Sequence, residues 1–357
     1  DNDGNGGNGN GNEIENGTIL KGTITSDVTL AAGNTYKLSG EYIVEEGGTL
    51  HIEEGVKIIA VYDDIADYIL VKQGGKINAV GTPDKPIVMT SEKEEPGAWG
   101  GIHICGRAHT NAEGGKGSSE IGGAVYGGND DADNSGTLQY IRLEYTGFAF
   151  DEEHEANGIS FYSVGNGTIV DHCQAYKGSD DGFEFFGGSV NVSNLVAVSC
   201  SDDSFDWTEG WNGKGTNLVA YQEAESTLGY DCDCLMECDN NGSNNAATPV
   251  AHPVLKNLIL VGNGGSKQGI RLRAGTEVEI DNAKVCGKGQ PLTVETALTE
   301  NALKNGTSKL TNITLTSELS SKEGIYTHAD FIAVTSNKVD ANLSYSSFED
   351  IRKECSW

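Results

Sequence analysis

The feature that most constrains this chain is a repeat of about 22 residues that runs from residue 158 to residue 231. Each unit opens with a short segment in which apolar, mostly aromatic residues alternate with polar ones, and an Asp-Asp pair ends the first two units. Alternation with a period of 2 indicates a strand with one buried face. The matching positions are Asp180 and Asp202, Phe183 and Phe205, and Phe185 and Trp207. Repeated strands with no room for helical crossovers predict a right-handed parallel β-helix, an all-β solenoid.

A second strand in each unit follows a recurring polar position, which is His172 in one unit and asparagine in the later ones. Stacked coils would place these amides about 4.8 Å apart, which predicts a hydrogen-bonded asparagine ladder. The ladder positions are Asn194, Asn217, Asn257, Asn282 and Asn312. The expected interior columns are Ile159, Phe183, Phe205 and Ile270, and beside them Phe161, Phe185, Trp207 and Leu272.

The repeat divides the chain into three parts. Residues 1–16 are rich in Gly, Asn and Asp and predict a flexible tether, residues 17–290 the β-helix, and residues 291–357 the last irregular coils with a cap. Polar insertions are expected at 106–137, 148–157 and 236–252, and short helices at 299–304 and 348–354. We predict that the terminal helix covers the last coil, because an open β-helix end is an exposed edge.

Composition excludes several classes of function. A formal net charge of −29 argues against nucleic acid and anionic lipid as partners. No apolar run approaches the roughly 18 residues of a membrane span. The 8 cysteines lack a zinc spacing; Cys173 and Cys232 are expected to point inward. The remaining candidates for disulfides are Cys234, Cys238, Cys286 and Cys355.

The outward positions of the first strand predict an acidic column. At the strand centres we expect Ser160, Glu184, Asp206, Asp231 and Arg271 to point out, with His103 at one end. Carboxylates at this spacing repel one another unless a cation, protons or arginine compensate, and oxygen ligands suit Ca²⁺. The predicted metal ligands are Asp181, Glu184, Asp203, Asp206 and Asp231. The alternative is that the Asp-Asp pairs only satisfy backbone NH groups at turns.

A weaker calcium signal lies at residues 131–136, which match the first half of an EF-hand-like loop. The twelfth position is Arg142 rather than the required Glu, so the alternative there is a polar turn.

Residues near the acidic column could contact a saccharide. Arg271 and Arg273 either bind sugar carboxylates or offset the acids. Tyr162, Phe186 and Trp211 are expected to be exposed and to stack on sugar rings, and His103 is expected to join them.

Several stretches resemble a family of exported β-helix proteins, common in Bacteroidetes, within the pectate-lyase-like superfamily. They are residues 42–55, 97–102, 130–144, 180–188 and 206–210. The resemblance implies a β-helix on the cell surface and carries no catalytic assignment. The Gly/Asn/Asp tether is typical of a bacterial lipoprotein, so we expect a lipid anchor on the extracellular face of the outer membrane, through a Cys not present in this sequence.

Two functions remain open. The first is a monomeric surface lipoprotein that binds a polysaccharide or a cell-surface glycan, or acts as an adhesin, with Ca²⁺ in the acidic column. The second is a Ca²⁺-dependent polysaccharide lyase or a glycoside hydrolase that acts on an acidic polysaccharide. A lyase needs a base, for which Lys177, His103 and His172 are the candidates; a hydrolase could pair Asp202 or Asp203 with Asp206. The lack of a convincingly placed base favours binding.

Overall fold

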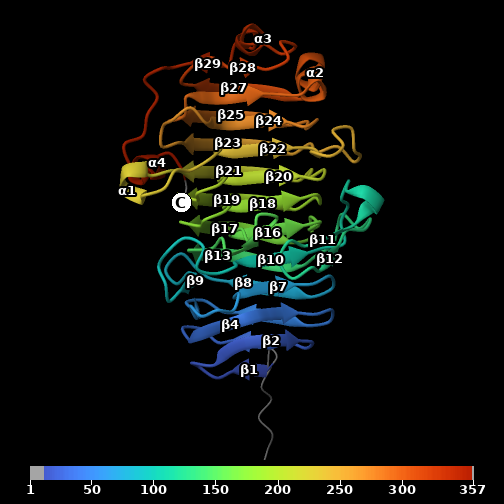
Figure 1. The fold of residues 1–357 in the computed structure, drawn as a ribbon, viewed down its shortest axis with the longest axis vertical. Coiled ribbons are helices and arrows are strands. Elements are labelled where there is room, and N and C mark those ends of the chain that lie inside the picture. Colours follow the sequence, from blue (N-terminus) through green and yellow to red (C-terminus); the bar gives the residue numbers. More distant parts are fainter. Residues whose placement is uncertain (1–11, 356–357) are drawn as a thin grey trace, which may run out of the picture.

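The computed structural model describes residues 12–355, so residues 1–11 of the predicted tether lie outside the described part. Its strands stack into one long parallel β-helix, with the N-terminal coils at one end and α2 and α3 at the other (Figure 1). Register pairing is parallel throughout the coils, and each coil contributes to three sheets in turn. The prediction of a parallel β-helix is confirmed.

The first sheet carries the aromatic repeat. It is formed by β7 (Tyr68–Val71), β10 (Ile102–Cys105), β16 (Ile159–Tyr162), β18 (Phe183–Phe186), β20 (Phe205–Thr208), β22 (Met236–Asp239), β24 (Gln268–Arg273), β26 (Gln290–Val294) and β28 (Ser320–Ser321).

The second and third sheets share long strands that bend in the middle. These strands are β13 (Gly136–Glu144), β17 (Ile169–Tyr176), β19 (Asn191–Val198), β21 (Lys214–Tyr221), β23 (Val254–Val261), β25 (Glu279–Cys286) and β27 (Lys309–Leu315). Toward the N-terminus, β1 (Asn12–Ile14), β3 (Val28–Leu30), β5 (Thr49–Ile52) and β8 (Lys76–Val80) extend the second sheet. The third sheet continues through β6 (Lys57–Ala60), β9 (Ile87–Ser91) and β29 (Lys338–Val339), while β2 (Ile19–Ile24) and β4 (Thr35–Val44) cross between the third sheet and the first.

The predicted asparagine ladder lies at the bend between the second and third sheets. Asn217 accepts a hydrogen bond of 3.1 Å from the Asn257 amide and donates one of 3.1 Å to Asn194. Each ladder residue has a positive φ, for example 58° at Asn217, and Asn adopts this left-handed conformation more readily than other side chains that carry a Cβ. The bend therefore selects asparagine, and the amides then link successive coils.

The predicted interior columns are confirmed. Phe183 pairs in register with both Ile159 and Phe205, and the Phe183 and Phe205 rings stack with centroids 5.6 Å apart. Phe161 and Phe185 stack at 5.0 Å in the neighbouring column. These residues are almost completely buried, so the stacked rings form the core of the central coils.

The prediction of a third insertion at 236–252 was wrong at its start. Met236 opens β22 and pairs with Phe205, and Cys238, not Cys232, pairs with Trp207. The predicted insertion begins after β22 instead, at residue 240, and runs to the start of β23. An additional excursion, at residues 222–235, includes α1 (Glu225–Leu228). The excursion at 222–235 replaces the short turn of the earlier units. A count of 22 residues from β20 therefore ends before β22 begins.

The C-terminal region differs from its prediction in one respect. The expected helix at 299–304 is α2 (Ala297–Asn305), which ends at Gly306 with a φ of 84°. The terminal helix α4 (Phe348–Arg352) does not cover the last coil: its Ile351 packs beside Val196 and Val219 on the outward face of the third sheet. Phe331 of α3 (His328–Ala333) enters the main core near β27 and closes that end.

The predicted part boundaries also move. Strand β1 begins at residue 12, inside the expected tether, and pairs with β3. The coils continue past residue 290 through β27 and β29.

All 8 cysteines are free thiols, seven of them buried, so the four candidates for disulfides are not bridged. None of the helices formed by residues 12–355 is long and apolar enough to cross a membrane.

Candidate functional site

The outward column of the first sheet differs in one position from the predicted one. Ser160, Glu184 and Asp206 occupy successive coils, and His103 precedes them, as predicted. The next residue is Glu237, followed by Arg271.

Asp231 lies elsewhere, in the excursion before β22, where it is exposed and 3.9 Å from the Lys267 ammonium. The alternation of Met236 and Cys238 around Glu237 was the signal in the sequence that could have identified the correct strand.

The insertion after β10 covers part of this column. It contains η1 (Glu113–Gly115) and a hairpin of β11 (Gly117–Ser118) and β12 (Val125–Tyr126), which lies beside β16 in Figure 1. Ile121 and Tyr126 pack on the outward rings of Tyr162 and Phe186. The Tyr126 hydroxyl donates to Glu209 at 2.9 Å, which fixes the insertion to β20 and the turn after it.

The expected exposed aromatic residues are therefore buried. Tyr162 is 0% exposed and Phe186 is 7% exposed, because the insertion replaces solvent over both rings. Trp211 is 1% exposed and stacks on Phe185 at 4.1 Å inside the coil. The prediction that these three rings stack on sugars was wrong for that reason.

His103 is also enclosed. Its ring is completely buried, and its Nε2 lies 2.6 Å from the Gly100 carbonyl oxygen. Burial lowers the pKa of His103 to about 4, so the ring is neutral at pH 7. A ring that is completely buried does not reach a saccharide at the surface, which corrects its assignment as a saccharide-binding residue.

Beyond the covered part, nine carboxylates line a pocket of about 180 Å³. Those of the first sheet and its turns were predicted, whereas those of the insertion and of the β14 (Ala149–Asp151)–β15 (His154–Glu155) hairpin were not. The pocket is lined by Glu120, Glu152, Glu153, Glu155, Asp180, Asp181, Glu184, Asp202 and Asp206. We call these nine residues the acidic pocket. Only the fold could bring Glu120 and the hairpin to it.

The Asp-Asp pairs serve the backbone at the same time. The Asp181 carboxylate accepts a hydrogen bond of 2.9 Å from the Asp203 amide, and the Asp203 carboxylate accepts one of 2.8 Å from the Cys234 amide. Turn chemistry is thus part of the role of these residues. Each of these bonds occupies the Oδ1 atom of the carboxylate, which has a second oxygen to offer.

Burial and mutual repulsion make the acidic pocket costly to ionise. Burial, and after it the charges of Asp202 and Glu155, raises the pKa of Asp180 to about 8. Burial and the nearby Glu155 raise the pKa of Glu120 to about 7. The pKa values of Asp181, Glu184 and Asp206, and of Asp203 beside the pocket, are raised well above their usual range, again by burial first. Such a cluster must take up protons or a cation at neutral pH.

The two predicted arginines are already paired with acids. The Arg271 guanidinium lies 3.2 Å from Glu237 and 3.3 Å from Glu295. The Arg273 guanidinium lies 2.9 Å from Glu237 and 2.7 Å from Asp239. These contacts favour the alternative in which both arginines offset the acids at the C-terminal end of the column.

The donor geometry fits a hard cation. Oxygens of Asp181, Glu184 and Asp206 lie within 4.8 Å of one another, and so do oxygens of Asp180, Asp181 and Asp202. A third carboxylate group combines Asp203, Asp206 and Glu237, and a fourth group adds Cys234 to Asp203 and Asp233. The all-oxygen groups have the ligand type that Ca²⁺ prefers.

The EF-hand-like stretch serves the insertion instead. Asp131 Oδ1 accepts from the His109 amide at 3.0 Å and lies 2.8 Å from its Nδ1, and Asp133 accepts from the Arg107 amide at 2.9 Å. This stretch supplies none of the metal-ligand groups found among residues 12–355.

The candidate catalytic groups are not assembled. Lys177 is 3.7 Å from Glu223 at the end of the third sheet, and His172 lies at the bend between the second and third sheets. Asp203 and Asp206 offer oxygens within 4.8 Å of each other, closer than the roughly 6.5–9.5 Å of an inverting hydrolase. The Asp203–Asp206 pair therefore lacks the separation predicted for an inverting hydrolase, and neither Lys177 nor His172 lines the acidic pocket.

The comparisons with known proteins agree with the architecture. A family model described as a pectate-lyase-like β-helix domain matches residues 22–355. No curated protein and no solved structure matches the chain. Since the match spans nearly the whole chain and almost all of the coils described above, this chain belongs to the family of pectate-lyase-like β-helix domains.

Proposed function

We propose that this chain is a surface-exposed polysaccharide-binding β-helix in which the acidic pocket holds a divalent cation, with Ca²⁺ the best match. The observation that carries the proposal is the concentration of nine carboxylates, with no basic side chain among the lining residues, around about 180 Å³. A hard cation with oxygen ligands removes the repulsion that raises their pKa values.

The cation would also give the pocket a role in binding. Ca²⁺ takes six to eight oxygen ligands, more than one group of three carboxylates supplies. Glu184 and Asp206 keep partly exposed side chains, so an ion beside them remains open to further oxygens. The hydroxyl and carboxylate groups of a polysaccharide supply such oxygens, and water supplies them in its absence.

Binding is preferred to catalysis because the described residues place no free base beside the acidic pocket. His154, in the hairpin that carries Glu155, lies 2.7 Å from Asp151, and Lys267 lies 3.5 Å from Asp233, so both are engaged. The expected setting is a monomer on the extracellular face of the outer membrane, held by an N-terminal lipid anchor. The chain's high negative charge suits a cation-dependent glycan contact and disfavours nucleic acid.

The test is calorimetric titration of chelator-treated protein with Ca²⁺, followed by glycan-array binding with and without Ca²⁺. Glu184→Gln/Asp206→Asn should abolish both the calcium heat and the calcium-dependent glycan signal. The matched control is Glu318→Gln/Glu323→Gln, which removes the same charge from exposed positions at the far end and should leave both signals intact. No calcium binding by the wild type, or equal glycan binding by the two double variants, would overturn the proposal.

A further inference from the structure

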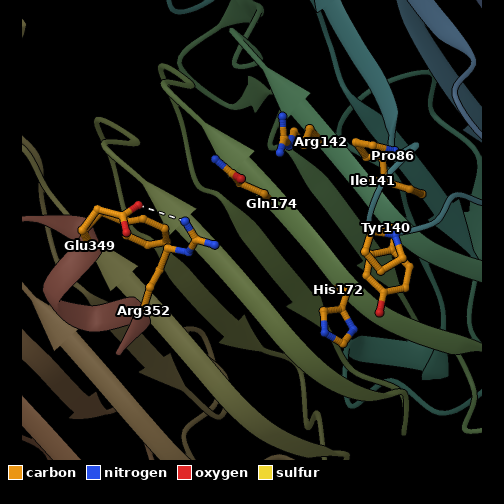
Figure 2. Close-up of a pocket in the computed structure, with 10 residues that line it drawn as sticks. Pro86, Tyr140, Ile141, Arg142, His172, Gln174, Glu349 and Arg352 are labelled. Carbon is orange, nitrogen blue, oxygen red and sulfur yellow. Dashed lines mark hydrogen bonds and ion pairs between the residues drawn. The ribbon is translucent and has the colours of Figure 1, made fainter. Parts of the chain in front are cut away.

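A second pocket, of about 350 Å³, lies on the outward face of the third sheet, away from the acidic pocket (Figure 2). One side is formed by α4, the opposite side by Tyr140, His172 and the loop that carries Pro86, and the floor by β13 and β17. We call it the third-sheet pocket. Its size is in the range of pockets that hold small ligands.

The third-sheet pocket exists because the cover of this sheet is incomplete. The C-terminal segment packs on apolar outward residues such as Val196 and Val219 through Ile351. The corresponding outward residues of the earlier strands are polar, namely Gln174 on β17 and Arg142 on β13. The apolar contact of the C-terminal segment stops where these polar outward residues begin. Helix α4 therefore borders the open part of the sheet without covering it.

Arg142 is the distinctive residue of this pocket. The sequence has five arginines. Four of them, at positions 107, 271, 273 and 352, form ion pairs with carboxylates. Within the described residues no hydrogen bond or ion pair reaches the exposed guanidinium of Arg142. An uncommitted guanidinium on a chain of net charge −29 marks a site for an anion.

The other residues that line the pocket include an amide and aromatic side chains, which suit a sugar ring better than a bare ion. Gln174 pairs in register with Arg142 on the adjacent strand, so the two residues stand one strand spacing apart at the backbone. Tyr140 and His172 stack with centroids 4.5 Å apart, and Asp171 lies 2.9 Å from the His172 Nδ1. Both aromatic residues have a φ of 51°, which places them at the bend between the second and third sheets.

The side of the pocket formed by α4 carries charged side chains. Arg352 of α4 is held 2.9 Å from Glu349, as the dashed line in Figure 2 marks, with Phe348 beside them. The pocket thus offers a planar anion-binding group and an amide on the floor between two walls that contain aromatic rings. This combination matches a six-membered ring that carries a carboxylate and hydroxyl groups.

We infer that the third-sheet pocket binds a carboxylate-bearing sugar ring, with the carboxylate on Arg142, ring hydroxyls on Gln174, and the ring between the Tyr140–His172 wall and α4. The inference rests on the proposed polysaccharide-binding function, but it does not need the cation. It gives the β-helix a second contact to an acidic polysaccharide, on a different sheet from the first.

The experiment is calorimetric titration with a four-unit oligogalacturonate in the presence of chelator, so that the acidic pocket holds no cation. We expect saturable binding, no binding of the neutral galactose counterpart, and a loss of about tenfold or more in affinity in Arg142→Gln. Arg107→Gln is the matched control, because Arg107 is ion-paired with Glu46 and remote from this pocket, and it should bind as the wild type does.

Three results would overturn the inference: no oligogalacturonate binding in chelator, equal binding of the neutral oligosaccharide, or an affinity unchanged by Arg142→Gln. Because Arg142 is exposed and makes no polar contact with the rest of the described chain, Arg142→Gln should have the same Tm as the wild type. The Glu184→Gln/Asp206→Asn variant separates the two sites: it should lose calcium-dependent binding and retain the chelator-resistant binding. If the wild type shows no calcium-dependent binding but retains the chelator-resistant binding, the proposed cation site is refuted and the third-sheet pocket is not.

Discussion

Removal of calcium at slightly alkaline pH should destabilise this β-helix, and acidification should restore it. The reason is the raised pKa of the buried acids: Asp180 moves from an ordinary value of 3.8 to about 8 in the folded chain. A proton on such a group stabilises the folded state fully below about pH 4, and this contribution is lost as the pH rises to about 8. The cation-free protein should therefore be more stable at pH 5 than at pH 8.

The size of the effect is measurable. A pKa change from 3.8 to about 8 corresponds to several kcal/mol, on the order of 5 kcal/mol, for Asp180 taken alone. Calcium at a hundredfold excess over its dissociation constant adds about 2.7 kcal/mol to the free energy of unfolding. If all 357 residues unfold together, the unfolding entropy makes 1 kcal/mol worth roughly 1.3 °C, so calcium should raise the Tm by about 4 °C.

The assay is differential scanning calorimetry at pH 5 and pH 8, each with chelator and with excess Ca²⁺. Calcium should raise the Tm at pH 8 and have less effect at pH 5, where protons compete for the same oxygens. Glu184→Gln/Asp206→Asn should flatten both responses, and Glu318→Gln/Glu323→Gln should not. A wild-type Tm that is indifferent to pH, calcium and chelator would refute the reasoning, and the Asp-Asp pairs would then act only in turns.

Three further predictions concern the fold. Asn217→Ala should lower the free energy of unfolding by about 1–3 kcal/mol in urea titrations, and Asn217→Gly should cost less because glycine keeps the positive φ; equal costs would contradict the role of the bend. Tyr126→Phe loses the hydroxyl hydrogen bond to Glu209, so it should lower the free energy of unfolding by about 1.5–3 kcal/mol and speed proteolysis within residues 106–135. Unchanged cleavage would contradict the role of this bond in holding the insertion. Phe331→Ala should cost about 3–5 kcal/mol and expose the β27 amides to hydrogen exchange; protected amides would show that α3 is not the cap.

Much of the architecture could be predicted from the sequence because a β-helix is a local, repeated structure. Each coil meets its neighbours in nearly the same way, so alternation of buried and exposed residues fixes the column of Phe183 and Phe205. The asparagine ladder was equally accessible, since the same side chain recurs at each bend. The prediction lost register only where the excursion at 222–235 interrupted the count, which placed Asp231 where Glu237 belongs.

The candidate sites depended on parts that do not repeat. The insertion after β10 covers Tyr162 and Phe186 and brings Glu120 to the acidic pocket, and no local pattern specifies where such a loop folds back. The third-sheet pocket joins Arg142 to Arg352, more than two hundred residues later in the chain, because α4 packs along the third sheet rather than over the last coil. Strand periodicity determined which side chains face outward. Which of those remain open to a ligand was decided by the long-range packing of the insertion and the C-terminal segment, since that packing buries some outward residues and leaves others beside solvent.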